Sequence, residues 1–439
     1  MQIIQQILFV LCAGVAGWLF AKKVKEIRRN IFLGRPESLN DNPRARWNNM
    51  LLLALGQKKM FKRPLPAIFH FFVYAGFILI NIEVLEIIVD GTLGTTRAFA
   101  PFLGSFYSFV ISFFEILGVL VLISVIIFFI RRNIYKVPRL NMKELEGFPR
   151  KDANAILYIE MVLMSMLLIM NAADTVIMQR EGGTVHNFLI SGMIAPAFEG
   201  FSTSALHIVE RVCWWGHILG IFAFLNYLPY SKHFHIILAF PNAYYGRLDP
   251  QGKMKNMPEI QKEVLYMMQP ELAPAEPQEG APQRFGARDV QDLSWKSLLD
   301  AYACTECGRC TAVCPANQTG KLLSPRRIMM ATRDRLEEVG NNITKNGSFV
   351  DDGKSLVHDY ITVEELRACT TCQACVEACP VSIEPLSIID QLRRYLIMEE
   401  SNAPQEWNLM SSNIENNMAP WKFSPDERDQ WAVEMNAES

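Results

Sequence analysis

The chain has 439 residues, of which half are hydrophobic and 20% are charged. It is too long for one ordinary domain and too apolar for an average soluble protein. The formal net charge of -2 shows no basic excess, so we expect no nucleic-acid partner. Apolar residues concentrate before residue 241, and polar and charged residues dominate after it. The composition therefore predicts a membrane part followed by a water-exposed part.

Five apolar runs precede residue 241, and each is long enough to cross a bilayer as a helix, which takes about 20 residues. The run at 109–130 carries a single charge, Glu115, which disfavours a set of buried helices in a soluble protein. We therefore expect five membrane spans, approximately at residues 3–21, 67–89, 106–130, 155–178 and 207–230.

Basic residues are unevenly distributed among the connections between these runs. They are frequent at 22–63 and 131–151, whereas the other two connections contain few, Arg97 in one and Arg180 in the other. Because Lys and Arg stay on the cytoplasmic side, we expect the N-terminus outside the inner cell membrane and the C-terminal part in the cytoplasm. No basic residue precedes the first run, so we interpret it as a retained span and not a cleaved signal peptide.

Histidines near the ends of the second and fifth spans are candidates for haem ligation. Haem b held between two helices needs two imidazoles at matching depth. His70 lies near the inner end of the second span, and His233 and His235 lie at or beyond the inner end of the fifth. His70 and His235 would thus meet at the same membrane face. A histidine at a helix end is equally compatible with the membrane interface, and His217 lies in the middle of the fifth span.

Ionisable residues also occur in the outer half of the predicted spans, where charged groups are costly. One interpretation is a quinone pocket with a proton route. The other, which we favour because ion pairing alone would suffice, is that an arginine neutralises one carboxylate and the others reach the interface. The residues are Glu83, Glu115, Asp174, Glu210 and Arg211.

The part that follows the fifth span divides into three segments. Residues 246–289 are expected to be a linker, because they include a stretch rich in Pro and Ala. Residues 290–400 are expected to form an α-helical domain, with helices near 326–339 and 386–398. The tail, 401–439, is polar but contains three Trp residues, which rarely stay exposed without a partner, so we expect it to dock on another subunit. These residues are Trp407, Trp421 and Trp431.

Eight of the ten cysteines form two copies of one motif, C-x2-C-x2-C-x3-C followed by Pro. Four closely spaced thiolates can wrap an iron–sulfur cube, and this spacing is typical of ferredoxins with two [4Fe–4S] clusters. Each C-x2-C-x2-C loop supplies three ligands to one cube, and the fourth Cys of each motif ligates the other cluster. We therefore assign one cluster to Cys304, Cys307, Cys310 and Cys379, and the second to Cys369, Cys372, Cys375 and Cys314.

Other roles fit these cysteines less well. Zinc ribbons use C-x2-C pairs and not this run. Disulfides are disfavoured because the segment is expected to face the cytoplasm, where thiols stay reduced. The remaining two, Cys12 and Cys213, lie in apolar runs and are expected to be small core residues.

The membrane part resembles a known family over residues 1–245. The stretch from His217 to His235 contains a His, a Gly three residues later, Pro-x-Ser, and a second His 18 residues after the first, and a Phe-His pair ends at His70. These features resemble the cytochrome b subunit of respiratory nitrate reductase and its relatives in heterodisulfide reductase. The resemblance implies a five-helix bundle in which His70 and His235 bind an inner haem b. The family's second-helix partner for His217 would lie at Ile80, which leaves His217 to a second haem or to a quinone.

The soluble part resembles other iron–sulfur proteins. Its motifs, C-T-E-C-G-R-C-T-A-V-C-P, then S-P-R, then C-T-T-C-Q-A-C-V-E-A-C-P, fall within 290–400. They resemble the small two-cluster subunit of heterodisulfide reductase and the iron–sulfur subunit of glycolate oxidase. The tail stretches at 413–422 and 428–432 resemble the link that, in fused relatives, leads into cysteine-rich CCG domains. The resemblance implies a separate CCG-domain subunit on which the tail docks.

These patterns predict an all-α membrane protein, with a five-helix cytochrome b-like transmembrane bundle followed by an α-helical dicluster ferredoxin domain. Its expected role is electron transfer between a soluble donor or the CCG-domain partner and the quinone pool, through two [4Fe–4S] clusters and one haem b. A flavoprotein is one candidate for the donor, since the chain itself has no Gly-rich nucleotide signature. The alternative is a haem-free membrane anchor for a soluble iron–sulfur oxidoreductase, and a third hypothesis is ion translocation by the buried carboxylates.

Overall fold

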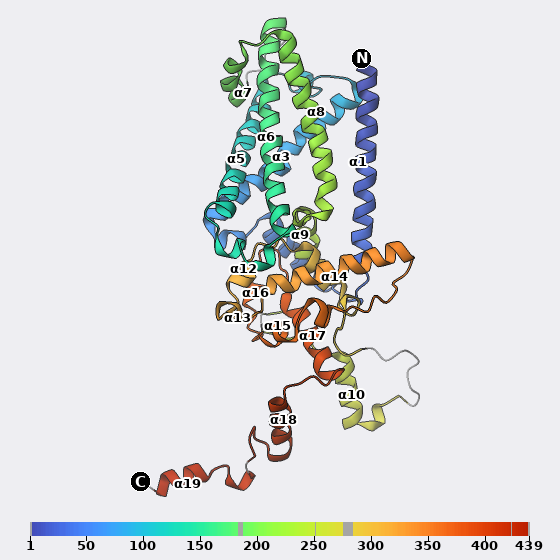
Figure 1. The fold of residues 1–439 in the computed structure, drawn as a ribbon, viewed down its shortest axis with the longest axis vertical. Coiled ribbons are helices and arrows are strands. Elements are labelled where there is room, and N and C mark those ends of the chain that lie inside the picture. Colours follow the sequence, from blue (N-terminus) through green and yellow to red (C-terminus); the bar gives the residue numbers. More distant parts are fainter. Residues whose placement is uncertain (1, 183–187, 251, 275–283, 423, 438–439) are drawn as a thin grey trace.

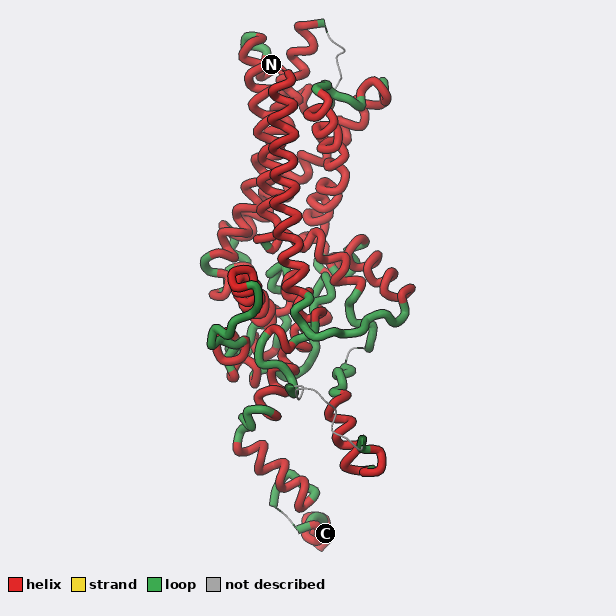
Figure 2. The backbone as a smooth tube through the Cα atoms, turned by 90° about the vertical axis from the view of Figure 1, so that its right-hand side faces the viewer, coloured by secondary structure: helices red, strands yellow, loops and turns green. Residues whose placement is uncertain are grey.

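The computed structural model describes residues 2–182, 188–250, 252–274, 284–422 and 424–437, and this part of the chain is helical and contains no β-strand (Figure 2). A long helical bundle forms one half of the molecule, and a smaller helical domain lies below it in Figure 1. We call the end of the bundle that meets this domain the proximal end and the opposite end the distal end. The N-terminus lies at the distal end (Figure 1).

Five helices of the bundle are long and apolar enough to cross a membrane. At about 1.5 Å per residue, even the shortest is about 37 Å long, which exceeds a hydrocarbon core of about 30 Å. The helices extend past the predicted apolar runs because helix-forming charged residues, such as those at 22–31, continue them. They are α1 (Gln2–Ile31), α3 (Pro64–Leu93), α5 (Ser105–Asn133), α6 (Phe148–Glu181) and α8 (Thr203–Tyr227).

Helix α6 is the most buried of the five and packs between α5 and α8. Its apolar side chains, among them Leu163 and Leu167, form the core of the bundle. The close approach of α8 requires Gly220, because a Cβ atom there would lie 2.7 Å from the Leu163 side chain. At the distal end, α7 (Leu189–Ile194) and a 3-10 turn (Ala195–Phe198) cover α5 and α6.

Short helices connect the spans at the proximal end. Pro229 lacks the N–H group that would continue α8, so the fifth span stops there and His235 begins a separate helix. The connection between α1 and α3 consists of α2 (Pro43–Met50), a π-helical turn η1 (Leu51–Leu55) and a 3-10 turn η2 (Met60–Lys62). Two 3-10 turns, η3 (Pro138–Leu140) and η4 (Lys143–Leu145), lie between α5 and α6. After α8 come η6 (Leu228–Tyr230), η7 (Lys232–Phe234) and α9 (His235–Tyr244).

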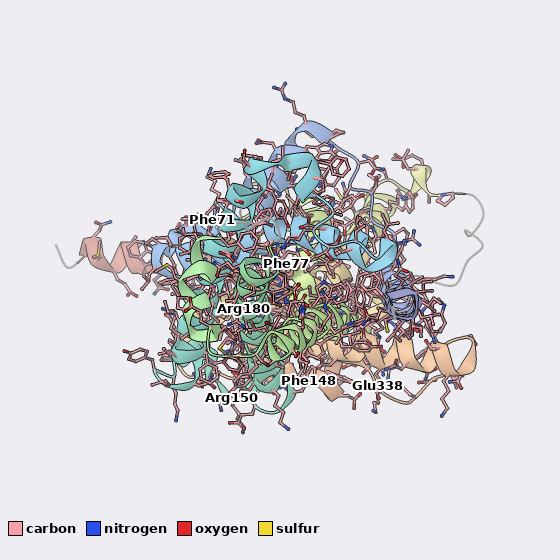
Figure 3. The ribbon with its side chains drawn as sticks, turned by 90° about the horizontal axis from the view of Figure 1, so that it is seen from above. Phe71, Phe77, Phe148, Arg150, Arg180 and Glu338 are labelled. Carbon is pink, nitrogen blue, oxygen red and sulfur yellow. The ribbon has the colours of Figure 1, made fainter. Side chains whose placement is uncertain are left out.

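The second domain shares an apolar core with the proximal end of the bundle. Ile27 and Ile31 of α1 pack in the same cluster as Leu298 of the domain, and Lys23 of α1 lies 3.1 Å from Glu337. The two halves are therefore joined by a packed surface. Seen from the distal end, α14 projects to one side beneath the bundle, with Glu338 on it (Figure 3). The domain helices are α11 (Trp295–Ala303), α12 (Arg309–Ala312), α13 (Pro315–Gln318), α14 (Pro325–Asn346), α15 (Val363–Arg367), α16 (Ala374–Ala378) and α17 (Pro385–Met398), with turns η9 (Val290–Asp292) and η10 (Leu356–Tyr360).

The segment predicted as a linker, 246–289, has more structure than its composition indicates. It contains α10 (Pro258–Met268) and a 3-10 turn (Pro270–Leu272), whereas residues 251 and 275–283 lie outside the described part. Near its end Ala287 is fully buried, and its N–H donates to Gln391 O at 2.9 Å. The C-terminal part of this segment therefore belongs to the packed domain.

The tail extends away from the domain as two short helices (Figures 1 and 2). Trp407, Trp421 and Trp431 are between 46% and 64% exposed. The predicted docking segment thus keeps these three Trp residues open to solvent. The elements are α18 (Gln405–Asn417), η11 (Pro425–Glu427) and α19 (Gln430–Ala437).

Candidate redox site

The two cysteine motifs lie in loops with matching backbone conformations. In the first loop Glu306 and Gly308 have positive φ angles of 53° and 70°. In the second loop the residues at the same two positions, Thr371 and Gln373, have φ angles of 55° and 60°. Left-handed backbone is costly for residues with a Cβ atom and persists where surrounding structure demands it. Here the repeated conformation turns successive cysteines toward one side of each loop.

The structure brings cysteines of both motifs together. A small cavity is lined by Cys304, Cys307 and Cys310 of the first motif and by Cys379 of the second. Cys314, the fourth cysteine of the first motif, lies close enough to Cys369 and Cys375 that, in addition to burial, its charge raises their pKa values. Each group of three thus lies beside the fourth cysteine of the other motif. No three His, Cys, Asp or Glu side chains in the described ranges converge on a single metal ion, and a four-iron cube holds its thiolates further apart than one ion does.

Four of the eight thiols are buried, among them Cys304, Cys375 and Cys379, and burial changes their acidity. Burial raises the pKa of Cys304 to about 11 and those of Cys375 and Cys379 to about 12, with neighbouring thiols adding to the last two shifts. Free thiols with such pKa values would be protonated at neutral pH, whereas bound iron replaces the protons. The Ile383 N–H lies 3.3 Å from the Cys379 sulfur, and such hydrogen bonds tune cluster potentials. The donor set therefore fits iron–sulfur clusters.

The first cysteine loop packs against the proximal end of the bundle. Glu306, which is 4% exposed, pairs with Lys232 from η7 and with Arg333 of α14, the latter at 2.6 Å. Burial alone would raise the pKa of Glu306, but these two cations outweigh it and hold that pKa below its usual value. Arg139 donates to the carbonyl oxygen of Cys307. The loop between Cys304 and Cys310 therefore faces the membrane part.

His70 and His235 face each other at the same proximal end. Their ring centroids lie 6.4 Å apart, with an angle of 41° between the ring planes. A metal–imidazole bond of about 2.0 Å would separate two axial nitrogens by about 4 Å and their ring centroids by about 6 Å. The His233 ring is 5.5 Å from that of His235 and nearly perpendicular to it. The two predicted imidazoles are therefore close enough that both could bind one iron.

The hydrogen bonds of both imidazole rings involve Nδ1, so they leave Nε2 available to bind a metal. Nδ1 of His70 lies 3.1 Å from Gln57 Oε1, and Nδ1 of His235 lies 3.1 Å from Lys232 O. Because both partners are acceptors, each Nδ1 carries the proton and each Nε2 has its lone pair free. Tyr74, one turn after His70 on α3, has a buried hydroxyl without a hydrogen-bond partner among the described residues. This orphaned donor and the two free Nε2 atoms fit a bound haem.

Gln57 is a residue of this site that the sequence did not single out. It is 6% exposed and has a φ angle of 50°, in the turn that follows η1. A left-handed glutamine after Gly56 in a connection between spans carries no recognisable motif. Only the fold brings its side chain to His70.

His217 lies apart from the other two imidazoles. It is 2% exposed on α8, and its Nδ1 lies 3.0 Å from Leu163 O. Ile80 occupies the position of α3 where the resemblance would place a partner imidazole, and this side chain is buried. The structure therefore pairs His70 with His235 and gives His217 no matching ligand on α3.

The ionisable residues of the distal half are mostly paired. Arg211 lies 2.5 Å from Glu210, as the ion-pair interpretation requires for one carboxylate. A second arginine, Arg97 in the connection after α3, donates to Asp174 at 2.9 Å. Glu115 accepts from the backbone N–H groups of Ile190 and Ser191 in α7, at 2.9 and 3.1 Å. Glu83 has no hydrogen bond or ion pair among the described residues.

Comparisons with known proteins agree with the cysteine motifs. Residues 300–383 match the family model of the 4Fe-4S dicluster domain. The chain is 30% identical over 98% of its length to the probable iron-sulfur-binding oxidoreductase FadF of Bacillus subtilis (strain 168), covering 61% of that protein. It is 26% identical over 92% of its length to the EtfAB:quinone oxidoreductase of Syntrophomonas wolfei, covering 54% of that protein.

A further relative matches a shorter stretch of the chain. It is one of the subunits of the ferredoxin/F(420)H(2)-dependent CoB-CoM heterodisulfide reductase of Methanosarcina acetivorans, and the identity is 34% over 24% of this chain and 53% of that relative. No solved structure matches the chain. The chain thus spans little more than half the length of the two longer relatives. It is a homologue of iron–sulfur oxidoreductases, with five helices long enough to span a membrane and a 4Fe-4S dicluster domain that supports a role in electron transfer.

Proposed function

We propose that the chain is a membrane-bound electron-transfer subunit that passes electrons between a soluble donor or a CCG-domain partner and the quinone pool. The observation that carries this proposal is the contact between the first cysteine loop and the segment that holds His235. Lys232 is common to both, because its side chain pairs with Glu306 and its carbonyl oxygen accepts from His235 Nδ1. Redox groups held by the loop and by the imidazoles would therefore be neighbours.

Two [4Fe–4S] clusters would supply one-electron chemistry in the soluble domain. The cavity shared by three cysteines of one motif and the fourth of the other supports crossed ligation. The exposed Cys372 supports a second cluster near the surface, where a protein partner can approach. The ligand sets would be Cys304, Cys307, Cys310 and Cys379 for the first cluster and Cys369, Cys372, Cys375 and Cys314 for the second.

One haem b, held by His70 and His235, would supply one-electron chemistry in the membrane part. Gln57 and the Lys232 carbonyl would orient the two rings by accepting their Nδ1 protons, as the hydrogen-bond partners of metal-bound histidines do. Leu163 O fixes the ring of His217 in the same way and leaves its Nε2 free, so His217 is a candidate for a quinone contact or for a second haem.

The arrangement also implies an orientation and a partner. The basic connections would keep the proximal end and the dicluster domain in the cytoplasm, with the distal end outside the inner cell membrane. The chain would divide into a haem-binding bundle (1–245), a connecting segment (246–289), a dicluster domain (290–400) and a docking tail (401–439). The exposed Trp residues of the tail support docking of a CCG-domain subunit there. The name of one relative, EtfAB:quinone oxidoreductase, supports a protein donor and a quinone.

The experiment that tests this proposal is a reduced-minus-oxidised optical spectrum of the purified full chain, with iron and haem quantified on the same sample. We expect eight non-haem irons and one b-type haem per chain. The haem band should disappear in His70→Ala and in His235→Ala but persist in the control His358→Ala, whose ring lies in the soluble domain near Glu400. Eight non-haem irons without any haem band would instead support the haem-free anchor.

A further inference from the structure

The distal end of the bundle contains a cavity of about 650 Å³ between α1, α3, α6 and α8. Its lining runs from Glu83, which is 6% exposed, to His207 and Glu181, whose side chains are 48% and 51% exposed. At about 1.5 Å per residue, Glu83 lies about 15 Å below the distal end of α3 and about 20 Å from the level of His70. The cavity therefore connects a buried carboxyl with the distal surface and lies apart from the imidazole pair.

Glu83 differs from the other carboxylates around this cavity because it has no partner. Glu86 accepts hydrogen bonds from the Tyr107 hydroxyl and from Phe99 N, both at 2.8 Å. Asp90 accepts from Thr95 Oγ1 at 2.7 Å and from two backbone N–H groups. Among the described residues, Glu83 receives no hydrogen bond and forms no ion pair.

Charged or titratable groups line the cavity or act on Glu83 from α3, α5, α6, α8 and the connection after α3. The remaining carboxylates near it are matched by cations or by N–H donors, so they do not compete for its ligand. The charged or titratable residues are Glu86 and Asp90 on α3, Arg97 in the following connection, Glu115 on α5, Asp174 and Glu181 on α6, and His207, Glu210 and Arg211 on α8. Helix α1 adds only Gln5, Gln6 and Phe9.

The nature of this lining decides which ligand the cavity can take. A metal ion needs several converging ligands, and no three such side chains converge in the described part of the chain. The lining combines carboxylates and guanidinium groups with apolar side chains such as Met170 and Trp214. An apolar quinone ring would have to displace water from the charged groups, which is costly. A lone buried carboxylate is neutralised most simply by a proton. Polar cavities of this size hold water, which can carry that proton.

We propose that Glu83 is a proton-binding site that exchanges with the aqueous phase at the distal face of the bundle. One face of α3 carries three carboxylates at spacings i, i+3 and i+7, which are Glu83, Glu86 and Asp90. Their oxygen atoms follow one another from the interior of the bundle toward the distal surface. A proton enters through the cavity and converts the Glu83 carboxylate to the neutral acid, and it leaves by the same route. This site depends neither on the haem nor on the quinone of the proposed function.

The test uses the full chain reconstituted in lipid vesicles in one orientation. The vesicles are treated with dicyclohexylcarbodiimide, which modifies protonated carboxyl groups in apolar surroundings, and the modified residues are found by mass spectrometry. The pH on the distal side is varied while the pH on the side of the dicluster domain is held constant, and then the reverse. We expect the modification of Glu83 to rise severalfold as the pH on the distal side falls. It should not change with the pH on the side of the dicluster domain.

Glu160 of α6 is the matched control, because it is 9% exposed, lacks a partner among the described residues and does not line the cavity. Its modification should not follow the distal pH. The proposal is overturned if Glu83 stays unmodified at every pH, or if its modification follows the pH on the side of the dicluster domain. Protection of Glu83 by added Na⁺ or Ca²⁺ would overturn it in favour of a metal cation. In Glu83→Gln the modification at this position must be absent, which verifies the assignment.

Discussion

At the scale of single residues, Glu306 links the first cysteine loop to the proximal end of the bundle. It lies between Cys304 and Cys307, and it holds one cation from the bundle segment and one from α14. Breaking a buried ion pair by neutralising one member leaves the partner uncompensated and costs about 3 kcal/mol. Net charge near an iron–sulfur cluster also sets its reduction potential. Glu306 therefore affects both the attachment of the domain and the electronic properties of the adjacent site.

We expect Glu306→Gln to lower the thermal stability of the chain and to raise the reduction potential of one cluster, because a negative charge beside it is lost. The measurement is a redox titration followed by electron paramagnetic resonance, together with a thermal melt. Thr371→Val is the matched control, since Thr371 has the same position and backbone conformation in the second loop but carries no charge. Equal shifts of both clusters in Glu306→Gln would show that the first loop does not hold a separate cluster.

At the scale of elements, the connection between α5 and α6 binds the N-terminal end of α14 through hydrogen bonds. Arg326 of α14 is completely buried and donates to Arg139 O at 2.6 Å and to Glu144 at 2.7 Å. Burial alone would raise the pKa of Glu144, but the hydrogen bond and the charge of Arg326 outweigh it and hold that pKa below the usual value of 4.5. A carboxyl whose pKa is lowered in the folded state contributes stability that is present above its unfolded pKa and lost as the pH falls through its folded pKa.

The variant Glu144→Gln should therefore be less stable than the wild type at pH 7, by about 3 kcal/mol for a broken buried pair. The difference between the two proteins should shrink as the pH falls below 4.5, the usual pKa of this group. Thermal melts at a series of pH values measure it, and acid damage to bound clusters affects both proteins alike. Glu146→Gln, an exposed neighbour in the same connection, should match the wild type throughout. A difference that stays constant with pH would mean that Glu144 contributes by packing and not by its charge.

At the scale of the whole molecule, sequence patterns predicted most of the helices and motifs, but few of the contacts between segments distant in sequence. Apolar run length indicated five long helices, and cysteine spacing indicated the dicluster domain, because both patterns repeat within short stretches of chain. The partners of Glu306, the turn that brings Gln57 to His70, and the pairing of Arg97 with Asp174 arise from segments distant in sequence. Hydropathy did not predict that α1 continues as a helix to Ile31, because the charged end of this helix is stabilised by packing on the second domain.

The tail gives a prediction at this same scale. Helices α18 and α19 expose their Trp residues and extend from the domain (Figure 1), so removing residues 404–439 should leave the core of the chain intact. We expect the truncated chain to keep its non-haem iron, its optical spectrum and its melting temperature, and to accept electrons from a small chemical reductant at an unchanged rate. Its binding to the proposed CCG-domain subunit should be lost. The double variant Trp407→Ala and Trp431→Ala should weaken that binding with the tail still present, whereas Glu415→Gln, a polar change on the same tail, should not. Full binding by the truncated chain would place the partner surface on the dicluster domain, where Cys372 is exposed.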